Sequence, residues 1–220
     1  MQLFALMLNI LLLALTNTML KVSANPLAAR DYLPEGYKMG KMGFHGDVAG
    51  HEITYKGTIE EVLAYAEAKY PGVTNALVAR DDVPLVDTSE LTSSNITARS
   101  GDRACGEKKD CPLCLKWGWA FVQRIQQGIS FLNKVTATCN TDGKTCVRIS
   151  CSWHSAIYLC NDMEEHIELP CNWISTFAQD IIDDRKCRDD TPEIDAYRRA
   201  VGQQWAKTKP YNSYIGQASC

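Results

Sequence analysis

The sequence predicts an α+β fold, in which an antiparallel sheet carries two packed helices as an α/β sandwich, stapled by disulfides and preceded by a small ββα unit. All ten cysteines fall between Cys105 and Cys220. In the same part of the chain, apolar residues recur with helical spacing in two segments and alternate as in strands between them. Helices grouped on one face of an antiparallel sheet are typical of this class.

The first 24 residues have the pattern of a secretory signal peptide. Residues 3–15, LFALMLNILLLAL, form an apolar run shorter than the ~18 residues that a membrane-spanning helix needs. Val22-Ser23-Ala24 follows as a small-residue cleavage site. We therefore expect cleavage after about Ala24, a secreted and extracellular mature protein, and no stable membrane insertion.

Residues 25–72 are expected to form a small N-terminal unit. GFHGDV and HEITYKG have strand patterns, and TIEEVLAYAEAKY has a helical one. Thr58 and Glu61 have the spacing of a capping box, and Pro71-Gly72 ends the helix. A unit of this size without cysteines is weakly stable alone, so the sequence indicates a propeptide or a docking subdomain that can be separated from the rest.

Residues 73–104 are expected to be a linker, because small and polar residues dominate and no period is sustained. Asn95-Ile96-Thr97 is an N-glycosylation sequon, as an exposed loop of a secreted glycoprotein would carry. Arg80, Arg99 and Arg103 are candidate points of proteolytic processing, and an uncleaved linker is the alternative.

Residues 105–220 are expected to form the cysteine-rich domain. Helical patterns cover residues 115–135 and 172–186. Between them lie the strand patterns VTATC, CVRISC and SAIYLC, and the chain ends in AVGQQWA and YNSYIGQAS, which indicate a closing hairpin.

The ten cysteines predict five disulfides, since an even count in an oxidising compartment indicates a disulfide framework. Their connectivity cannot be read from spacing. Cys111-Pro-Leu-Cys114 has the spacing of half a zinc site, but no second close pair follows, so no metal and no cofactor are expected. The disulfide candidates are Cys105, Cys111, Cys114, Cys139, Cys146, Cys151, Cys160, Cys171, Cys187 and Cys220.

The stretch TCVRISCSWHSAIYLC raises the question of chemistry. Ser152 and His154 share a face of an extended strand, but no acid is fixed beside them. His166 lies near three glutamates and, with Arg148, could support ribonuclease-type acid–base chemistry. The more economical interpretation is a stapled β element in a protein that is not an enzyme, with no catalytic residues.

The cysteine-rich domain resembles the smut fungal killer toxin family over residues 105–220. ACGEKKDC, RISCSWHSAIYLC, CNWISTFAQDIIDDRKC and AVGQQWAKTKPYNSYIGQASC carry the resemblance, together with the total of ten cysteines. Cys114 is extra, and Cys187 stands alone where the family has a close pair. The family has a lysine just before its central-strand cysteine, whereas here Arg148 is the nearest cation.

The resemblance implies an α/β sandwich and a disulfide between Cys151 and Cys220. It also implies a fungal toxin or effector that acts on a target-cell surface protein or channel, in the best-known case by blocking calcium uptake. The exposed cations Arg148, Lys207 and Lys209 are the expected target contacts.

Charge and aromatic content limit the alternatives. Residues 1–99 carry a net charge of −3 and residues 100–220 are neutral, so no nucleic-acid partner is expected. A small nuclease-type enzyme and a carbohydrate-binding module stay open as alternatives. The latter would use exposed aromatics from the five tryptophans, Trp117, Trp119, Trp153, Trp173 and Trp205.

Overall fold

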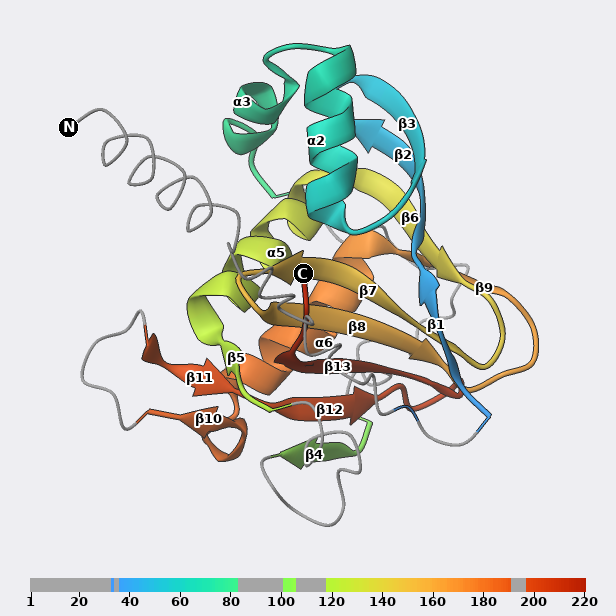
Figure 1. Ribbon diagram of the computed structural model, residues 1–220, viewed down its shortest axis with the longest axis vertical. Helices are drawn as coiled ribbons and strands as arrows, with labels where there is room; N and C mark the ends of the chain where they lie inside the picture. The colour runs from blue at the N-terminus through green and yellow to red at the C-terminus, as the bar shows by residue number, and fades with distance from the viewer. Residues whose placement is uncertain (1–32, 34–35, 83–100, 106–117, 191–196) are drawn as a thin grey trace, which may run out of the picture. The chain divides into compact units, whose positions relative to one another are not determined.

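Two main sheets and the helices packed against them hold most of the described chain (Figure 1). The computed structural model describes residues 33, 36–82, 101–105, 118–190 and 197–220, and the described residues lie in one compact unit. The expected signal peptide lies outside the described residues. The α+β class predicted from the sequence is confirmed.

The larger sheet has six strands in the order β1-β7-β8-β13-β12-β4. Its neighbours pair antiparallel except β1, which runs parallel to β7. The strands are β1 Lys38–Lys41, β7 Thr145–Ser152, β8 Ser155–Asn161, β13 Tyr211–Gln217, β12 Gly202–Trp205 and β4 Arg103–Cys105.

The second sheet is antiparallel, in the order β3-β2-β6-β9, and a small third sheet has the order β10-β11-β5. The strands of the second are β3 His51–Lys56, β2 Gly43–Val48, β6 Thr136–Thr141 and β9 Ile167–Pro170. Those of the third are β10 Arg188–Asp189, β11 Arg199–Ala200 and β5 Ala120–Phe121.

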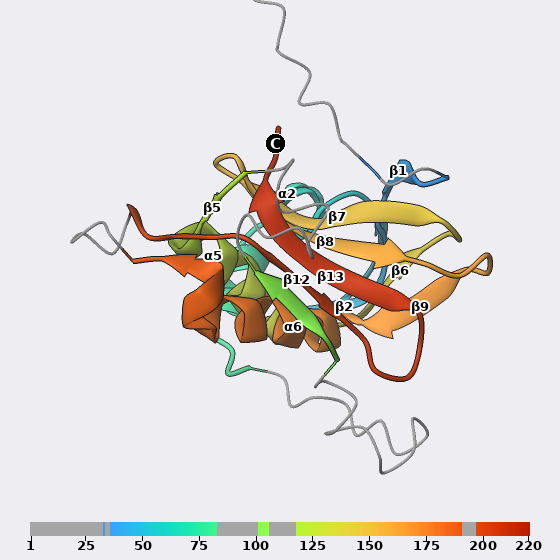
Figure 2. The ribbon, with the colours of Figure 1, turned by 90° about the horizontal axis from the view of Figure 1, so that it is seen from below.

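The two long helices of the cysteine-rich part cover one face of the larger sheet, as the sequence predicts (Figure 2). Each has an apolar stripe of buried residues with helical spacing, which packs against β8 or β13. The helices are α2 Ile59–Lys69, α3 Val73–Val78, α5 Val122–Lys134 and α6 Cys171–Asp183, with a 3₁₀ turn η3 at Arg185–Cys187.

Helix α5 begins later in the sequence than expected. The pattern predicts a helix from residue 115, but residues 120–121 form β5 and α5 begins at Val122. Gly118 has φ +68°, a left-handed conformation that a right-handed helix cannot contain. The expected strand VTATC also differs in place, because β6 belongs to the second sheet and pairs with β2.

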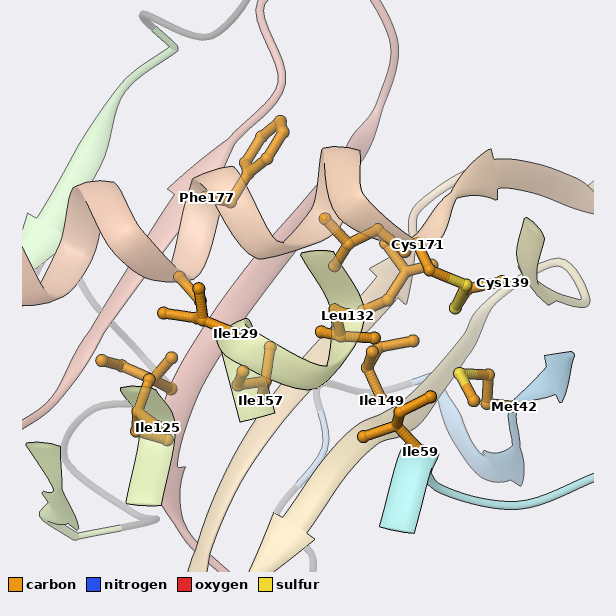
Figure 3. Packing of buried hydrophobic residues seen from close by; sticks show 14 of the residues in the cluster. Met42, Ile59, Ile125, Ile129, Leu132, Cys139, Ile149, Ile157, Cys171 and Phe177 are labelled. Carbon is orange, nitrogen blue, oxygen red and sulfur yellow. A yellow bond between two sulfur atoms is a disulfide. The ribbon is translucent and has the colours of Figure 1, made fainter. Parts of the chain in front are cut away.

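The N-terminal ββα unit is part of the same core as the cysteine-rich part. Its two strands, its helix and the Thr58–Glu61 capping box are as predicted. However, β2 pairs with β6, β1 pairs with β7, and Met42 and Ile59 lie buried against residues of α5 and β7 (Figure 3). The structure thus differs from the expectation of a separable unit. Likewise, the expected linker starts with a helix, α3.

Four disulfides staple the described residues, and the remaining two cysteines, Cys111 and Cys114, lie outside them. Cys146–Cys160 joins β7 to β8, and Cys139–Cys171 joins β6 to the start of α6. Cys105–Cys187 joins β4 to η3. Cys151–Cys220, the pair implied by the killer toxin resemblance, is present. Residues 145–160, the segment TCVRISCSWHSAIYLC, therefore form a β-hairpin cross-linked by disulfides.

Candidate functional site

The hairpin between β7 and β8 turns through two residues, Trp153 and His154, that both adopt left-handed backbone conformations. Their φ angles are 47° and 60°. Such a two-residue turn matches the twist of its strands, and it normally uses asparagine and glycine because both central residues need positive φ. A left-handed conformation costs an ordinary L-residue about 1–2 kcal/mol. Tryptophan is an unusual choice at this position.

Three contacts from other elements hold the turn in place. The amide of Ala218 donates to the carbonyl oxygen of His154 (3.1 Å), and the amide of Phe121 donates to Ser155 Oγ (2.9 Å). The Cys151–Cys220 disulfide closes the same region by joining the end of β7 to Cys220, three residues after the end of β13. The turn is therefore fixed by its surroundings.

Trp153 is exposed to 69%, the highest value among the large apolar side chains of the described residues. The guanidinium of Arg124, on α5, lies over its ring at 4.9 Å from the centroid, a cation–π geometry. Trp119 and Trp205 are instead half-buried, and they pack on the face of the larger sheet that α5 and α6 do not cover.

The remaining tryptophans give no further platform in the described chain. Trp173 lies in the main core and donates from Nε1 to the hydroxyl of Tyr211 (2.9 Å). Trp117 lies outside the described residues. Of the five tryptophans considered for sugar stacking, Trp153 is the one that the structure describes as exposed.

The expected target contacts do not form one patch. Arg148 on β7 is half-buried, and its guanidinium donates to the carbonyl oxygen of Ser219. Lys207 and Lys209 are exposed in the turn between β12 and β13. In the strand register Arg148 is level with Tyr214, whereas the two lysines precede Tyr211 at the end of β13. The predicted glycosylation site Asn95 lies outside the described residues.

The two histidines considered for acid–base chemistry lie at opposite ends of β8. His154 is in the turn before β8, and His166 follows it, five residues after Asn161. The seven residues of β8 span roughly 20 Å at 3.3 Å per residue. His166 Nδ1 lies 3.1 Å from Asp142 Oδ1 in an exposed pair. The two rings are too far apart to act together on one bond.

A surface hollow of ≈ 270 Å³ lies where β1, α2, β7 and the C-terminal residues meet. Lys41, Glu60, Glu61 and Arg148 face it, beside the Cys151–Cys220 disulfide. Three of these charges already have partners in the fold. Glu60 accepts from the amide of Cys151, Glu61 accepts from the amide of Thr58, and Arg148 donates to Ser219. Most of the charged side chains of the hollow are thus engaged in hydrogen bonds within the fold.

One group of metal-ligating residue types is close in space, but it is not a metal centre. Potential ligand atoms of Cys105, Asp184 and Cys187 lie within 4.8 Å of one another. The two sulfurs are joined in a disulfide, and only a thiolate sulfur is a good metal ligand. Asp184 instead accepts from the backbone amide of Lys186, which lowers the pKa of its carboxyl, and from Arg103.

A half-buried carboxyl, Asp162, gathers polar groups at the end of β8. It accepts from the hydroxyl of Tyr37 (2.9 Å) and from Nδ2 of Asn212 (3.0 Å). Burial raises the pKa of Asp162, although these two hydrogen bonds and the nearby Lys144 favour the ionised form. Burial and the hydrogen bond to Asp162 raise the pKa of Tyr37 to about 12. The cluster ties the segment before β1 to β13.

Comparison with known proteins gives no relative: no family model, no curated protein and no solved structure matches the chain. Among the helices that the structure describes, none combines the length and the apolar character needed to cross a membrane. The fold and its exposed side chains therefore carry what can be inferred about function.

Proposed function

We propose that the protein is a secreted cysteine-rich toxin or effector that acts on a target-cell surface by binding and performs no acid–base chemistry. The observation that carries the proposal is the stapled hairpin β7–β8, joined within itself by Cys146–Cys160 and to the C-terminus by Cys151–Cys220. Disulfides of this density are typical of proteins that work in oxidising compartments. Each such bond in a small secreted domain is typically worth about 2–5 kcal/mol.

The positions of the candidate catalytic groups favour binding over catalysis. General acid–base catalysis needs its groups within hydrogen-bond reach of one substrate. His154 and His166 are separated by the length of β8, and His166 is paired with Asp142 in the open. A nuclease mechanism that used both rings would need a different geometry.

The resemblance to smut fungal killer toxins supports a surface target, with calcium uptake as the process affected. The Cys151–Cys220 pair that the family implies is compatible with this assignment. Among the expected contacts, Lys207 and Lys209 are presented openly on a hairpin turn, so they are the cations that a partner can reach. Arg148 is expected to contribute less, because it is engaged with Ser219.

The test is to apply the purified protein to a panel of fungal and plant cells and to measure growth and calcium uptake. We expect inhibition of at least one cell type. Replacing Lys207 and Lys209 together by alanine should weaken the inhibition, most strongly at low salt, where charges are least screened. Lys56→Ala, an exposed lysine of β3, is the matched control. Absence of inhibition across the panel would contradict the proposed function.

A further inference from the structure

The turn at Trp153 combines backbone strain with an exposed aromatic side chain, and this combination points to a binding role. Strained conformations persist where the surrounding structure imposes them, and they cluster at functional sites. Here the amide of Ala218, the hydroxyl of Ser155 and the Cys151–Cys220 disulfide impose the turn. The ring that the turn presents is nevertheless 69% exposed. The fold thus holds rigidly a side chain that contributes little to its core.

We propose that Trp153 is a stacking platform for a pyranose ring of a β-linked glycan on the target-cell surface. The inference deepens the proposed function and rests on it for the location of the glycan. Arg124 lies over the Trp153 ring at 4.9 Å, and a ring covered on both faces could not be 69% exposed. Ring surface is therefore open to a ligand, while the cation–π contact restricts the rotamer.

The surroundings of Trp153 favour a sugar over a protein or a lipid surface. Its neighbours on the turn are Ser152 and His154, and Arg124 in turn donates to Gln127 (2.9 Å). These side chains carry hydroxyl, imidazole, guanidinium and amide groups, which can hydrogen-bond the hydroxyls around a sugar ring. A pyranose with equatorial substituents offers a C–H face to the aromatic ring and hydroxyls to such a rim.

The two other surfaces would need more apolar area. Protein hot spots lie in well-packed, fully desolvated centres of larger interfaces, and interfacial membrane binding needs a broad apolar face. Two of the other exposed large apolar side chains in the described chain, Tyr65 and Val78, belong to α2 and α3. The third is Tyr197. It precedes Arg198, whose carbonyl oxygen accepts from the backbone amide of Val122, the first residue of α5. A tryptophan whose immediate neighbours are polar fits a sugar ring better than either surface.

Rigid presentation of the ring reduces the entropy cost of binding. A side chain that is already ordered by its turn and by a cation–π contact loses little freedom when a ligand stacks on it. Phe121 also links the turn to a second exposed aromatic, since it bonds Ser155 and pairs with Arg199, two residues from Tyr197. A glycan longer than one sugar is therefore expected to bind more tightly than a monosaccharide.

The test is titration calorimetry with three soluble hexasaccharides, built from β-1,3-glucose, β-1,4-glucose and β-1,4-N-acetylglucosamine. The wild-type protein should bind at least one of them. Trp153→Ala should weaken that binding at least about tenfold, whereas Trp153→Tyr, which keeps an aromatic ring, should stay within a few-fold. Tyr65→Ala, which removes an exposed aromatic on α2, is the matched control and should bind as the wild type does. Circular dichroism and a thiol assay establish that each variant is folded and oxidised.

The outcomes separate this inference from the proposed function. Binding that is lost in Trp153→Ala and kept in Tyr65→Ala supports the platform, whether or not the protein inhibits cells. Inhibition of cells by a protein that binds none of the three glycans overturns the platform and leaves the proposed function standing. Glycan binding that Trp153→Ala leaves unchanged also overturns it.

Discussion

Glu60 on α2 and Cys151 on β7 are joined by a hydrogen bond of 2.9 Å, from the backbone amide of Cys151 to Glu60 Oε2. The other carboxylate oxygen accepts from Ser150 Oγ. Both donors follow an irregularity in the β7–β8 register between Arg148 and Ser150. A bulge disrupts the ladder locally and leaves backbone groups that need other partners. A carboxylate from a segment about 90 residues upstream thus completes the hydrogen bonding of the central strand.

Glu60→Ala should therefore destabilise the protein by about 1.5–3 kcal/mol, the range for hydrogen bonds to a charged group. The loss falls on a half-buried site, where water replaces the carboxylate poorly. Urea unfolding followed by circular dichroism measures the effect. Glu164→Ala is the matched control, because the Glu164 side chain is 81% exposed and its ion pair with Lys144 spans 3.8 Å. Equal stabilities of the two variants would contradict the role given to Glu60.

The shared core predicts how the protein behaves after one cut in the chain. With a specific protease site placed within residues 83–100, cleavage should give two fragments that elute together in size-exclusion chromatography and separate only in denaturant. The N-terminal fragment buries Met42, Phe44 and Ile59 in the common core. Each fully buried apolar side chain of this size contributes about 1.5–3 kcal/mol. Separation under native conditions would restore the separable unit that the sequence indicates.

The Asp162 cluster predicts a specific pH dependence of stability. Because burial raises the pKa of Asp162 above its ordinary value of 3.8, the folded protein binds this proton more tightly than the unfolded chain does. The contribution of this carboxyl to stability is therefore fully present below pH 3.8 and is lost as the pH rises through the folded-state pKa. Asp162→Asn removes this loss. Its free energy of unfolding, relative to wild type, should rise between about pH 3 and pH 7.

Urea titrations at several pH values measure this difference. A difference for Asp162→Asn that is flat with pH, or that falls, would show that the ionised carboxyl is not penalised in the fold.

The Trp153 turn is expected to lower the stability of the protein while it presents the tryptophan for binding. Replacing Trp153 and His154 by Asn and Gly supplies the residues that such turns prefer, and should relieve about 2 kcal/mol of strain over the two positions, for a net gain in stability of about 1 kcal/mol. Loss of the cation–π contact with Arg124 offsets part of the gain, by about 0.5–1 kcal/mol. Trp153→Val is the control in the opposite direction. A β-branched residue at positive φ is strained, so this variant should be less stable than the wild type. If Asn-Gly lowers stability as well, the turn is not strained.

Local patterns predict much of this fold from the sequence. The Thr58–Glu61 capping box gives the start of α2, and the apolar repeat through Phe177 gives most of α6. These signals lie within a few residues of each other, so tertiary contacts need not be known. The strands β2, β3, β7 and β8 follow for the same reason.

Partners distant in the sequence are what the patterns do not contain. Nothing near Glu60 indicates that its carboxylate bonds the amide of Cys151, and nothing near β2 indicates that it pairs with β6. The short strand β5 was missed because two residues show no period. The Trp153 turn had one usable signal, the gap of three residues between the strand patterns CVRISC and SAIYLC, but tryptophan and histidine are not the residues that hairpin turns prefer.

If the protein acts on its target by binding, without acid–base chemistry, neither His154 nor His166 is needed for its effect. The most direct test is growth inhibition by a variant carrying His154→Asn and His166→Asn. Asparagine tolerates the left-handed conformation of position 154, so the turn is kept while both imidazoles are removed. We expect inhibition within a few-fold of wild type. A correctly folded, fully oxidised double variant that loses about 10²–10⁴-fold in activity, as expected for loss of a catalytic histidine, would contradict it.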